Sequence, residues 1–231
     1  YFELAKGGLK EGQLKKNVRF GKTLIEIKNN GSSAILEGQI QEAIIKEVNN
    51  HETNPGNLSI KDFSIINPEK SAPVCSFYRE WKICGMGPPS SGGITVFQIL
   101  GILENFNLAQ LKQEEVWHLY SEASKLAYYD RNHYIADKEY VDVPIKEMLS
   151  SKYLRERSKL IKNNAVLQDV NPGNFDNFDL SSIGIDSTSE KSSTTHLSII
   201  DVYGNAISMT SSIEFMFGSG VMASGFLLNN Q

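Results

Sequence analysis

The sequence predicts an α/β fold, in which helices pack against β-sheets. Its 231 residues, 40% hydrophobic and 22% charged, have the composition of a globular protein, and one α/β domain can be this long. Two segments, residues 72–87 and 194–213, have the pattern of β-hairpins. Two long apolar helical patterns follow the first of these hairpins, as expected for helices that pack on a sheet.

Charge and composition exclude several classes of protein. Lys and Arg total 23 and Asp and Glu total 27, so the net charge of −4 offers no broad basic field for nucleic acid or an anionic membrane. No stretch approaches the ~20 consecutive apolar residues of a membrane span. Two cysteines do not build a disulfide scaffold, and the four histidines lack metal-binding spacing. We therefore predict no metal site and no cofactor.

The two ends of the sequence indicate a longer protein. The first residue is Tyr1 rather than Met, and the sequence stops at Gln231, directly after an apolar strand-like run. No charged and apolar leader is present, so a signal peptide is either absent or already lost. We expect the sequence to be part of a larger chain.

The first fifty residues predict two helices. Apolar residues recur with helical spacing over residues 18–27 and again over 35–48, and Asn29-Asn30-Gly31 supplies a stop signal between them. A turn follows at residues 54–57, after which Ser59 is placed to cap a short helix over residues 60–63.

The hairpin over residues 72–87 brings the two cysteines together. A two-residue turn at Arg79-Glu80 pairs Cys75 with Cys84, and opposed residues in antiparallel strands lie about 4.5–5.5 Å apart at Cα, within disulfide range. Arg-Glu is poor chemistry for the favoured two-residue turns, so this register stays open. A disulfide and two buried reduced thiols are both open at this point.

Two apolar helices are predicted next, over residues 94–103 and 113–129. The segment 90–93, Ser-Ser-Gly-Gly, has the composition of an anion-binding helix start, although a tight turn into the helix is the favoured interpretation. From residue 163 to residue 193 Asn, Asp, Ser and Gly dominate without apolar periodicity, which predicts a mobile linker. We interpret this linker as a segment that makes the chain accessible for proteolytic processing.

The second hairpin has a register that its side chains define. A five-residue loop over 201–205 places apolar residues opposite apolar residues, whereas a two-residue loop pairs apolar with polar. With the five-residue loop, Thr194 lies opposite Ser212. The same face carries His196 and a row of hydroxyl side chains, which by pattern alone is typical of a solvated sheet face. We interpret His196 as structural.

Several motifs occur along the chain in the order typical of one family. They are Pro88-Pro89-Ser90-Ser91-Gly92-Gly93, Glu122-Ala123-Ser124-Lys125-Leu126-Ala127-Tyr128 with Asp130-Arg131, Thr194-Thr195-His196, Gly204-Asn205-Ala206, Phe217-Gly218-Ser219-Gly220 and Leu227-Leu228-Asn229-Asn230-Gln231. In these motifs the sequence resembles the γ-glutamyltransferase (γ-glutamyltranspeptidase) family of N-terminal-nucleophile hydrolases. The resemblance covers nearly the whole chain.

The resemblance implies a precursor that cuts itself at the Ser193–Thr194 bond. Residues 1–193 would then be the C-terminal part of the large-subunit region, with residues 163–193 as its linker, and residues 194–231 would start the small-subunit region. The implied fold is a four-layer αββα sandwich, incomplete in this chain. The implied partners are the two subunits of one precursor, a small γ-glutamyl substrate, and an amino-acid, peptide or water acceptor. The implied compartment is periplasmic or extracellular.

The resemblance also assigns site residues. Thr194 is the implied nucleophile for γ-glutamyl amides such as glutathione, with its own α-amine as general base. Ser212 occupies the position of a supporting threonine, and Gln231 matches a residue that helps to hold the substrate's α-amino group. Glu214 stands where classical members have an asparagine that contacts the substrate's α-carboxylate, and a carboxylate there repels a carboxylate.

Three functions follow as hypotheses. The first is γ-glutamyl transfer or hydrolysis through a threonine acyl-enzyme. The substitution at Glu214 leaves room for a related amide or β-lactam (cephalosporin-type) acylase. The third is a non-catalytic fragment that lacks a complete pocket, since the family's carboxylate-binding arginine, its acid for the α-amine and its oxyanion region match no position in residues 1–231.

Overall fold

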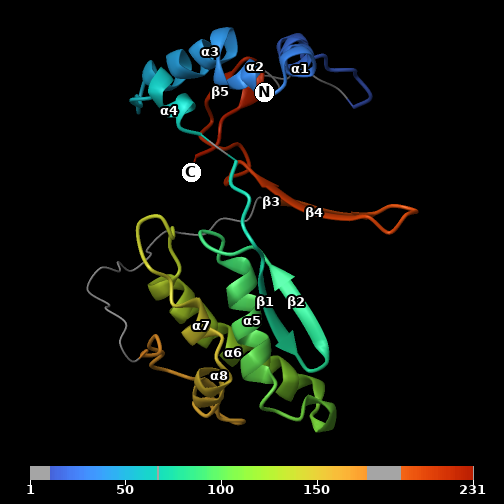
Figure 1. Cartoon of the computed structure of the whole chain (residues 1–231), viewed down its shortest axis with the longest axis vertical. Coiled ribbons are helices and arrows are strands. Elements are labelled where there is room, and N and C mark those ends of the chain that lie inside the picture. The colour runs from blue at the N-terminus through green and yellow to red at the C-terminus, as the bar shows by residue number, and fades with distance from the viewer. Residues whose placement is uncertain (1–10, 67, 176–193, 231) are drawn as a thin grey trace. The chain divides into compact units, whose positions relative to one another are not determined.

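The computed structural model describes residues 11–66, 68–175 and 194–230 (Figure 1). The chain divides into two compact units, one of residues 1–68 with 189–231 and the other of residues 69–188. This division is spatial, whereas the boundary predicted between residues 193 and 194 is one of processing and stays a prediction. Within the described residues, no helix is both long enough and apolar enough to cross a membrane.

The unit of residues 69–188 contains a hairpin packed on helices. Strands β1 (Val74–Tyr78) and β2 (Trp81–Gly85) pair antiparallel, with Cys75 opposite Cys84 as predicted. The two cysteines form a disulfide with a Cα–Cα distance of 4.1 Å, which decides between the two open alternatives. The helices of this unit are α5 (Gly92–Leu103), α6 (Gln113–Tyr134), α7 (Ile145–Met148) and α8 (Ser151–Ser158), with a 3₁₀ turn, η2 (Leu108–Gln110).

Apolar side chains from α5, α6 and α8 form the core of this unit. Helices α5 and α8 approach closely at Gly101, where a Cβ atom would lie 2.4 Å from Leu154 Cδ1. Burial of such side chains stabilises the unit by roughly 1.5–3 kcal/mol for each large residue. The buried cluster consists of Ile99, Ile102, Leu103, Leu119, Ala123, Leu126, Ala127, Leu154 and Ile161.

A fully buried carboxylate, Asp130, connects three helices of this unit to the chain that follows them. It accepts hydrogen bonds from Gln98 Nε2 at 3.0 Å, Tyr153 Oη at 2.6 Å, Arg157 Nη2 at 3.0 Å and the backbone N–H of Gly173 at 2.9 Å. Burial, followed by the charge and hydrogen bond of Asp130, raises the pKa of Tyr153, so its phenol keeps the proton that it donates. Asp130 therefore fixes the segment around Gly173 on the helices.

The described residues of the other unit form four helices and two pairs of strands. Its helices are α1 (Val18–Asn30), α2 (Ser33–Leu36), α3 (Gly38–Asn49) and α4 (Ile60–Ser64). Its strands are β3 (Thr194–Ile200), β4 (Ala206–Ser212), β5 (Met222–Ala223) and β6 (Phe226–Leu227), which pair as β3 with β4 and β5 with β6. The predicted helices over 18–27 and 60–63 are confirmed. The single helix predicted over 35–48 is instead two helices, α2 and α3, because Glu37 between them is extended, with φ −140° and ψ 156°.

The turn between β5 and β6 packs against α1. Thr23 Oγ1 donates to the carbonyl of Ser224 at 2.8 Å, and Asn17 Nδ2 donates to the carbonyl of Gly225 at 2.7 Å. Gly225 has φ +88°, and a Cβ atom there would lie 2.3 Å from the backbone nitrogen of Phe20. Only glycine fits this approach without displacing the helix.

A small core joins segments far apart in the sequence. Ile40, Ile44 and Phe63 are buried together with Ala223 of β5, and Phe226 and Leu228 pack against them. This core fixes residues 222–228, close in sequence to the second hairpin, on helices α3 and α4.

Candidate nucleophile site

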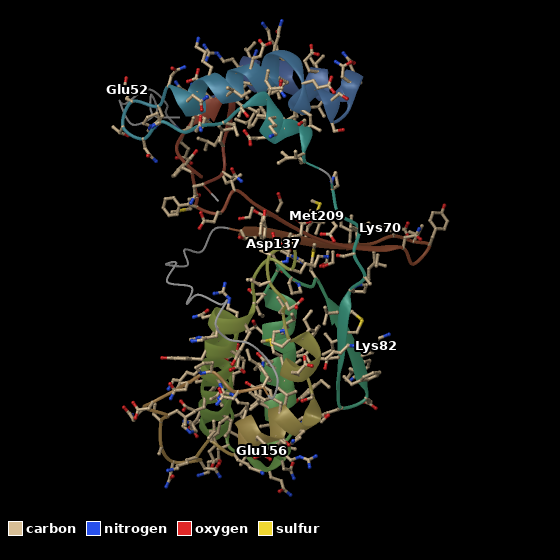
Figure 2. The ribbon with its side chains drawn as sticks, turned by 60° about the vertical axis from the view of Figure 1, so that its left-hand side comes forward. Glu52, Lys70, Lys82, Asp137, Glu156 and Met209 are labelled. Carbon is tan, nitrogen blue, oxygen red and sulfur yellow. A yellow bond between two sulfur atoms is a disulfide. The ribbon has the colours of Figure 1, made fainter. Side chains whose placement is uncertain are left out.

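The site is carried by a long two-stranded ribbon, β3 and β4 (Figure 1). Its register is the predicted one: Leu197 pairs with Met209, Ile199 with Ile207, and Thr194 with Ser212. Alternation of apolar and polar residues therefore predicted the pairing correctly. Figure 2 labels Met209 on β4.

Asp201 fixes the loop that joins the two strands. Its Oδ1 accepts from the backbone N–H of Tyr203 at 2.9 Å and of Asn205 at 2.8 Å, and its Oδ2 accepts from Asn205 Nδ2 at 2.8 Å. These hydrogen bonds, led by the one from the Asn205 side chain, lower the pKa of Asp201. Gly204 provides the positive φ, +84°, that the loop requires. The loop thus holds the register that sets Thr194 against Ser212.

The hydroxyl groups of the predicted catalytic pair are in contact. Thr194 Oγ1 lies 3.1 Å from Ser212 Oγ, and Ser212 Oγ also accepts the backbone N–H of Glu214 at 2.8 Å. The Glu214 N–H engages one of the two lone pairs of Ser212 Oγ, and either hydroxyl can be the donor in the Thr194–Ser212 contact. This geometry places a second hydroxyl, able to donate or to accept a hydrogen bond, beside the oxygen of Thr194.

His196 lies on the same face, among hydroxyl groups of both strands. Its Nδ1 lies 2.8 Å from Thr210 Oγ1, and its Nε2 lies 3.2 Å from both Ser198 Oγ and Ser208 Oγ. The ring thus links β3 to β4, which fits the structural role predicted for it. The opposite, apolar face is exposed, with Ile199 55%, Ile207 52% and Met209 46% accessible.

Glu214 lies at the turn after β4, in the left-handed region with φ +69°. Its carboxylate Oε2 accepts a hydrogen bond from Asn230 Nδ2, and Asn230 Oδ1 accepts the backbone N–H of Phe215 at 2.9 Å. Asn230 therefore ties both the side chain of Glu214 and the backbone of the turn to the chain after β6. The sequence identified Glu214 by its position in a motif and gave no signal for its pairing with Asn230.

Two predicted site residues, Ser193 and Gln231, lie outside the described residues. Thr194, Ser212 and Glu214 are brought together at one end of the hairpin. In the part of the chain that the structure describes, no group of three or more His, Cys, Asp or Glu side chains is placed to hold a metal ion. The chemistry that this arrangement offers is that of a hydroxyl nucleophile with a second hydroxyl beside it.

Comparison with known proteins places this geometry in context. A family model described as Gamma-glutamyltranspeptidase matches residues 1–231. The glutathione hydrolase proenzyme of Escherichia coli (strain K12) is 32% identical over 229 residues, which are 96% of this chain and 37% of that protein. The glutathione hydrolase proenzyme of Bacillus subtilis (strain 168) is also 32% identical, over 39% of its length. The chain thus spans less than two fifths of the length of these relatives.

Solved structures show the same similarity. The crystal structure of Helicobacter pylori gamma-glutamyltranspeptidase matches with 31% identity and a TM-score of 0.66, over 75% of this chain and 52% of that chain. Cephalosporin acylase from Bacillus halodurans matches with 23% identity and a TM-score of 0.79, over 98% of this chain and 38% of that chain. At that identity the second likeness concerns the fold alone.

Proposed function

Because this chain belongs to the gamma-glutamyltranspeptidase family, we propose that the protein carrying it hydrolyses or transfers γ-glutamyl groups through an acyl-enzyme on Thr194. The family comprises glutathione hydrolases and gamma-glutamyltranspeptidases, and the fold is the N-terminal-nucleophile hydrolase fold, of which this chain covers part. The observation that carries the proposal is the 3.1 Å contact between Thr194 Oγ1 and Ser212 Oγ.

The first step is cleavage of the precursor before Thr194. The Thr194 hydroxyl attacks the carbonyl carbon of Ser193, the Ser193–Thr194 amide bond breaks, and an ester forms in its place. Breaking of the amide bond frees the α-amine of Thr194. Water then hydrolyses the ester, which leaves a carboxylate on Ser193 and restores the hydroxyl of Thr194. The proenzyme names of the relatives support such a precursor, whose two chains are the large and small subunits.

The freed α-amine then serves as the general base. An α-amine titrates near pH 8, well below lysine, so at physiological pH a useful fraction of it accepts a proton. It takes the proton of the Thr194 hydroxyl as the oxygen attacks the γ-carbonyl carbon of the substrate. Ser212, whose lone pair is engaged by Glu214 N–H, donates its proton in a hydrogen bond to the attacking oxygen.

Collapse of the tetrahedral intermediate expels the amine and leaves the γ-glutamyl ester of Thr194. Water completes hydrolysis, and an amino acid or peptide completes transfer. No step requires a metal or a cofactor.

A second candidate is a related amide or cephalosporin-type β-lactam acylase. The specific observation in its favour is Glu214, whose backbone N–H donates to Ser212 Oγ at 2.8 Å. A carboxylate side chain at this position disfavours an acyl group that carries an α-carboxylate. The nucleophile and its processing are the same for both candidates, and only the accepted acyl group differs.

The test uses the protein expressed from its complete reading frame. The Thr194→Ala variant is expected to remain a single uncut chain and to release no nitroaniline from a γ-glutamyl nitroanilide. Thr194→Ser, which keeps a hydroxyl, is the matched control and is expected to be cut. Two chains with a new N-terminus at residue 194 in the alanine variant would contradict the assignment. Cleavage of a cephalosporin amide in place of the γ-glutamyl nitroanilide would favour the second candidate. If the intact protein is cut and acts on neither substrate, the non-catalytic alternative stands.

A further inference from the structure

The disulfide between Cys75 and Cys84 joins two cysteines with different surroundings. Cys84 of strand β2 is exposed, whereas Cys75 of strand β1 is half-buried. A disulfide is opened when a thiolate attacks one of its two sulfur atoms and the other sulfur leaves as a thiolate. Access helps to decide which sulfur is attacked, so a thiol from solution reaches Cys84 more readily than Cys75.

Cys75 lies beside a space that can take up the sulfur that leaves. It lines a cavity of about 560 Å³ whose other walls come from the end of α5 and from α8. Arg155 of α8 lines the same cavity, and a nearby cation favours the thiolate form of a cysteine. Glu104 lines it as well, with its Oε1 engaged by the backbone N–H of Arg79 at 2.8 Å. The cavity therefore suits Cys75 as the leaving group.

The hairpin has other contacts that hold its strands in register when the disulfide opens. Five residue pairs form the β1–β2 ladder. At the turn, the N–H of Arg79 donates to Glu104 at the end of α5. At the opposite end of the hairpin, a Cβ atom at Gly85 would lie 3.2 Å from the Cα of Gly93, at the start of α5. The two sulfur atoms thus stay opposite each other, and an opened disulfide can close again.

The face of the hairpin that carries the disulfide also carries a positive charge. Side chains alternate between two faces along a strand, so Lys82 lies on the same face as Cys84, two residues away. Lys82 is exposed (Figure 2), and Phe77, its partner across the ladder, is 66% exposed. A thiol that also bears a carboxylate is attracted by Lys82, and a thiol that bears an ammonium group is repelled.

We propose that Cys84 is a site of reversible S-thiolation by small thiols that carry a carboxylate, with Cys75 as the resolving cysteine. The thiolate attacks Cys84 Sγ and forms a new sulfur–sulfur bond with it. The Cys75–Cys84 bond breaks, and its electron pair stays on Cys75 Sγ as a thiolate. Attack by this thiolate on Cys84 Sγ reverses the step and releases the small thiol, so the exchange needs no further oxidant or reductant.

Trypsin separates the two cysteines, because Arg79 and Lys82 lie between them. The complete protein is treated with N-acetylcysteine and quenched with acid, and its remaining thiols are alkylated at mildly acidic pH before digestion. By mass spectrometry we expect the N-acetylcysteinyl group on Cys84 to exceed that on Cys75 by at least about tenfold, with the alkyl group on Cys75. An equal distribution, or a preference for Cys75, would overturn the proposal.

Two single variants cover the case in which Cys75 closes the disulfide too fast for the adduct to be trapped. Cys75→Ser leaves Cys84 as a thiol, and Cys84→Ser leaves Cys75. Each is treated with the symmetrical disulfide of N-acetylcysteine, which thiolates the cysteine and releases one N-acetylcysteine. We expect Cys84 to react at least about tenfold faster than Cys75. Equal rates, or a faster reaction at Cys75, would show that access does not favour Cys84 and would overturn the proposal.

Lys82→Gln tests the preference for a carboxylate-bearing thiol. Cysteamine, which carries an ammonium group, is the comparison compound. The ratio of the N-acetylcysteine rate to the cysteamine rate is expected to fall about threefold in this variant. Lys162→Gln removes the same charge from an exposed position of the same unit, and its ratio is expected to equal that of the wild type. An unchanged ratio in Lys82→Gln would overturn the assigned class of thiol. None of these measurements uses turnover at Thr194, so their outcome is independent of the proposed function.

Discussion

The side-chain oxygens of Thr194 and Ser212 lie 3.1 Å apart across the first pair of the β3–β4 ladder. The strand register sets this contact, and the N–H of Glu214, at 2.8 Å from Ser212 Oγ, directs the serine hydroxyl. The rate of a reaction at the Thr194 hydroxyl is therefore expected to depend on the Ser212 hydroxyl, which is not itself covalently modified.

Replacing Ser212 tests that dependence. In the complete protein, Ser212→Ala is expected to lower kcat for a γ-glutamyl nitroanilide by about 10²-fold, because the attacking oxygen loses a preorganised donor. Ser212→Thr retains the hydroxyl and is expected to stay within about tenfold of wild type. Steady-state kinetics on the processed forms of both variants gives the comparison. If the kcat of Ser212→Ala equals that of Ser212→Thr, the Ser212 hydroxyl has no role in the reaction.

Asp130→Asn is expected to destabilise the helical unit by about 3–5 kcal/mol, because it leaves the buried Arg157 guanidinium without its counter-charge. Arg157 Nη2 lies 3.0 Å from Asp130 Oδ1, with both side chains almost completely buried. Denaturant unfolding measures the change. Asp142→Asn, at an exposed position, is the control and is expected to shift the free energy of unfolding by less than about 0.5 kcal/mol.

Glu122 is expected to make stability depend on pH in the acid range. Burial raises its pKa, but the hydrogen bonds from Lys125 Nζ and from the backbone N–H of Leu167, together with nearby positive charge, lower it on balance. A carboxyl whose pKa is lower in the folded state contributes stability above its unfolded pKa, and that stability is lost as the pH falls below about 4. Urea midpoints measured between pH 7 and pH 3 are expected to fall less steeply in Glu122→Gln than in the wild type. Equal slopes would show that Glu122 is not a source of acid sensitivity.

The Cys75–Cys84 disulfide closes a short loop, with a sequence separation of 9. A loop of this length corresponds to about 2–3 kcal/mol of stability in the chain-entropy model. The double variant Cys75→Ser, Cys84→Ser is expected to lose this amount in urea unfolding. A reductant is expected to shift the wild type toward the double variant and to leave the double variant unchanged. A wild type insensitive to reductant despite complete reduction would contradict the prediction.

Comparing Gly225→Ala with Gly220→Ala separates two contributions to the loss of stability on adding a side chain: backbone strain at positive φ and steric contact with α1. At Gly225 a Cβ atom would meet the backbone of α1 at 2.3 Å, whereas at Gly220, which also has positive φ, it would meet nothing within 4 Å. Gly220→Ala is therefore expected to show only the conformational cost, about 1–2 kcal/mol. Gly225→Ala is expected to cost clearly more, because α1 must move. Thermal unfolding of the two variants side by side measures the difference, and equal losses would mean that α1 does not constrain this turn.

Both hairpins could be predicted from the sequence, because the period of two and the loop lengths are local properties. The turn at Arg79-Glu80 formed despite unfavourable residues: Arg79 adopts φ +54°, and its N–H donates to Glu104 Oε1 of the following helix segment at 2.8 Å. That hydrogen bond and the disulfide stabilise the turn by more than its unfavourable residues destabilise it. Neither interaction can be recognised from the two turn residues alone.

The contacts of Asp130 could not be predicted from the sequence. Its partners come from residues 23 to 43 positions away, and only the packed helices bring them together. The short strand β5 was likewise missed, since two residues are too few to produce a pattern, whereas β6 lies in the apolar strand-like run predicted near the end of the sequence. The pairing of Glu214 with Asn230 depends on the loop between them, which has no periodicity.

The exposed β3–β4 ribbon has a kinetic consequence. Thr194 and Ser212 are only 18 residues apart, and the ladder and the Asp201-capped loop between them need no distant segment to form. Hairpins of this kind close within about 1–10 μs, far faster than contacts that require long-range chain closure. We therefore expect the two hydroxyls to meet early during folding, while the core that joins Ile40 and Ile44 to Ala223 must await the closure of a much longer stretch of chain. The contact between the two hydroxyls is therefore expected to form earlier in folding than the core of the unit to which the ribbon belongs.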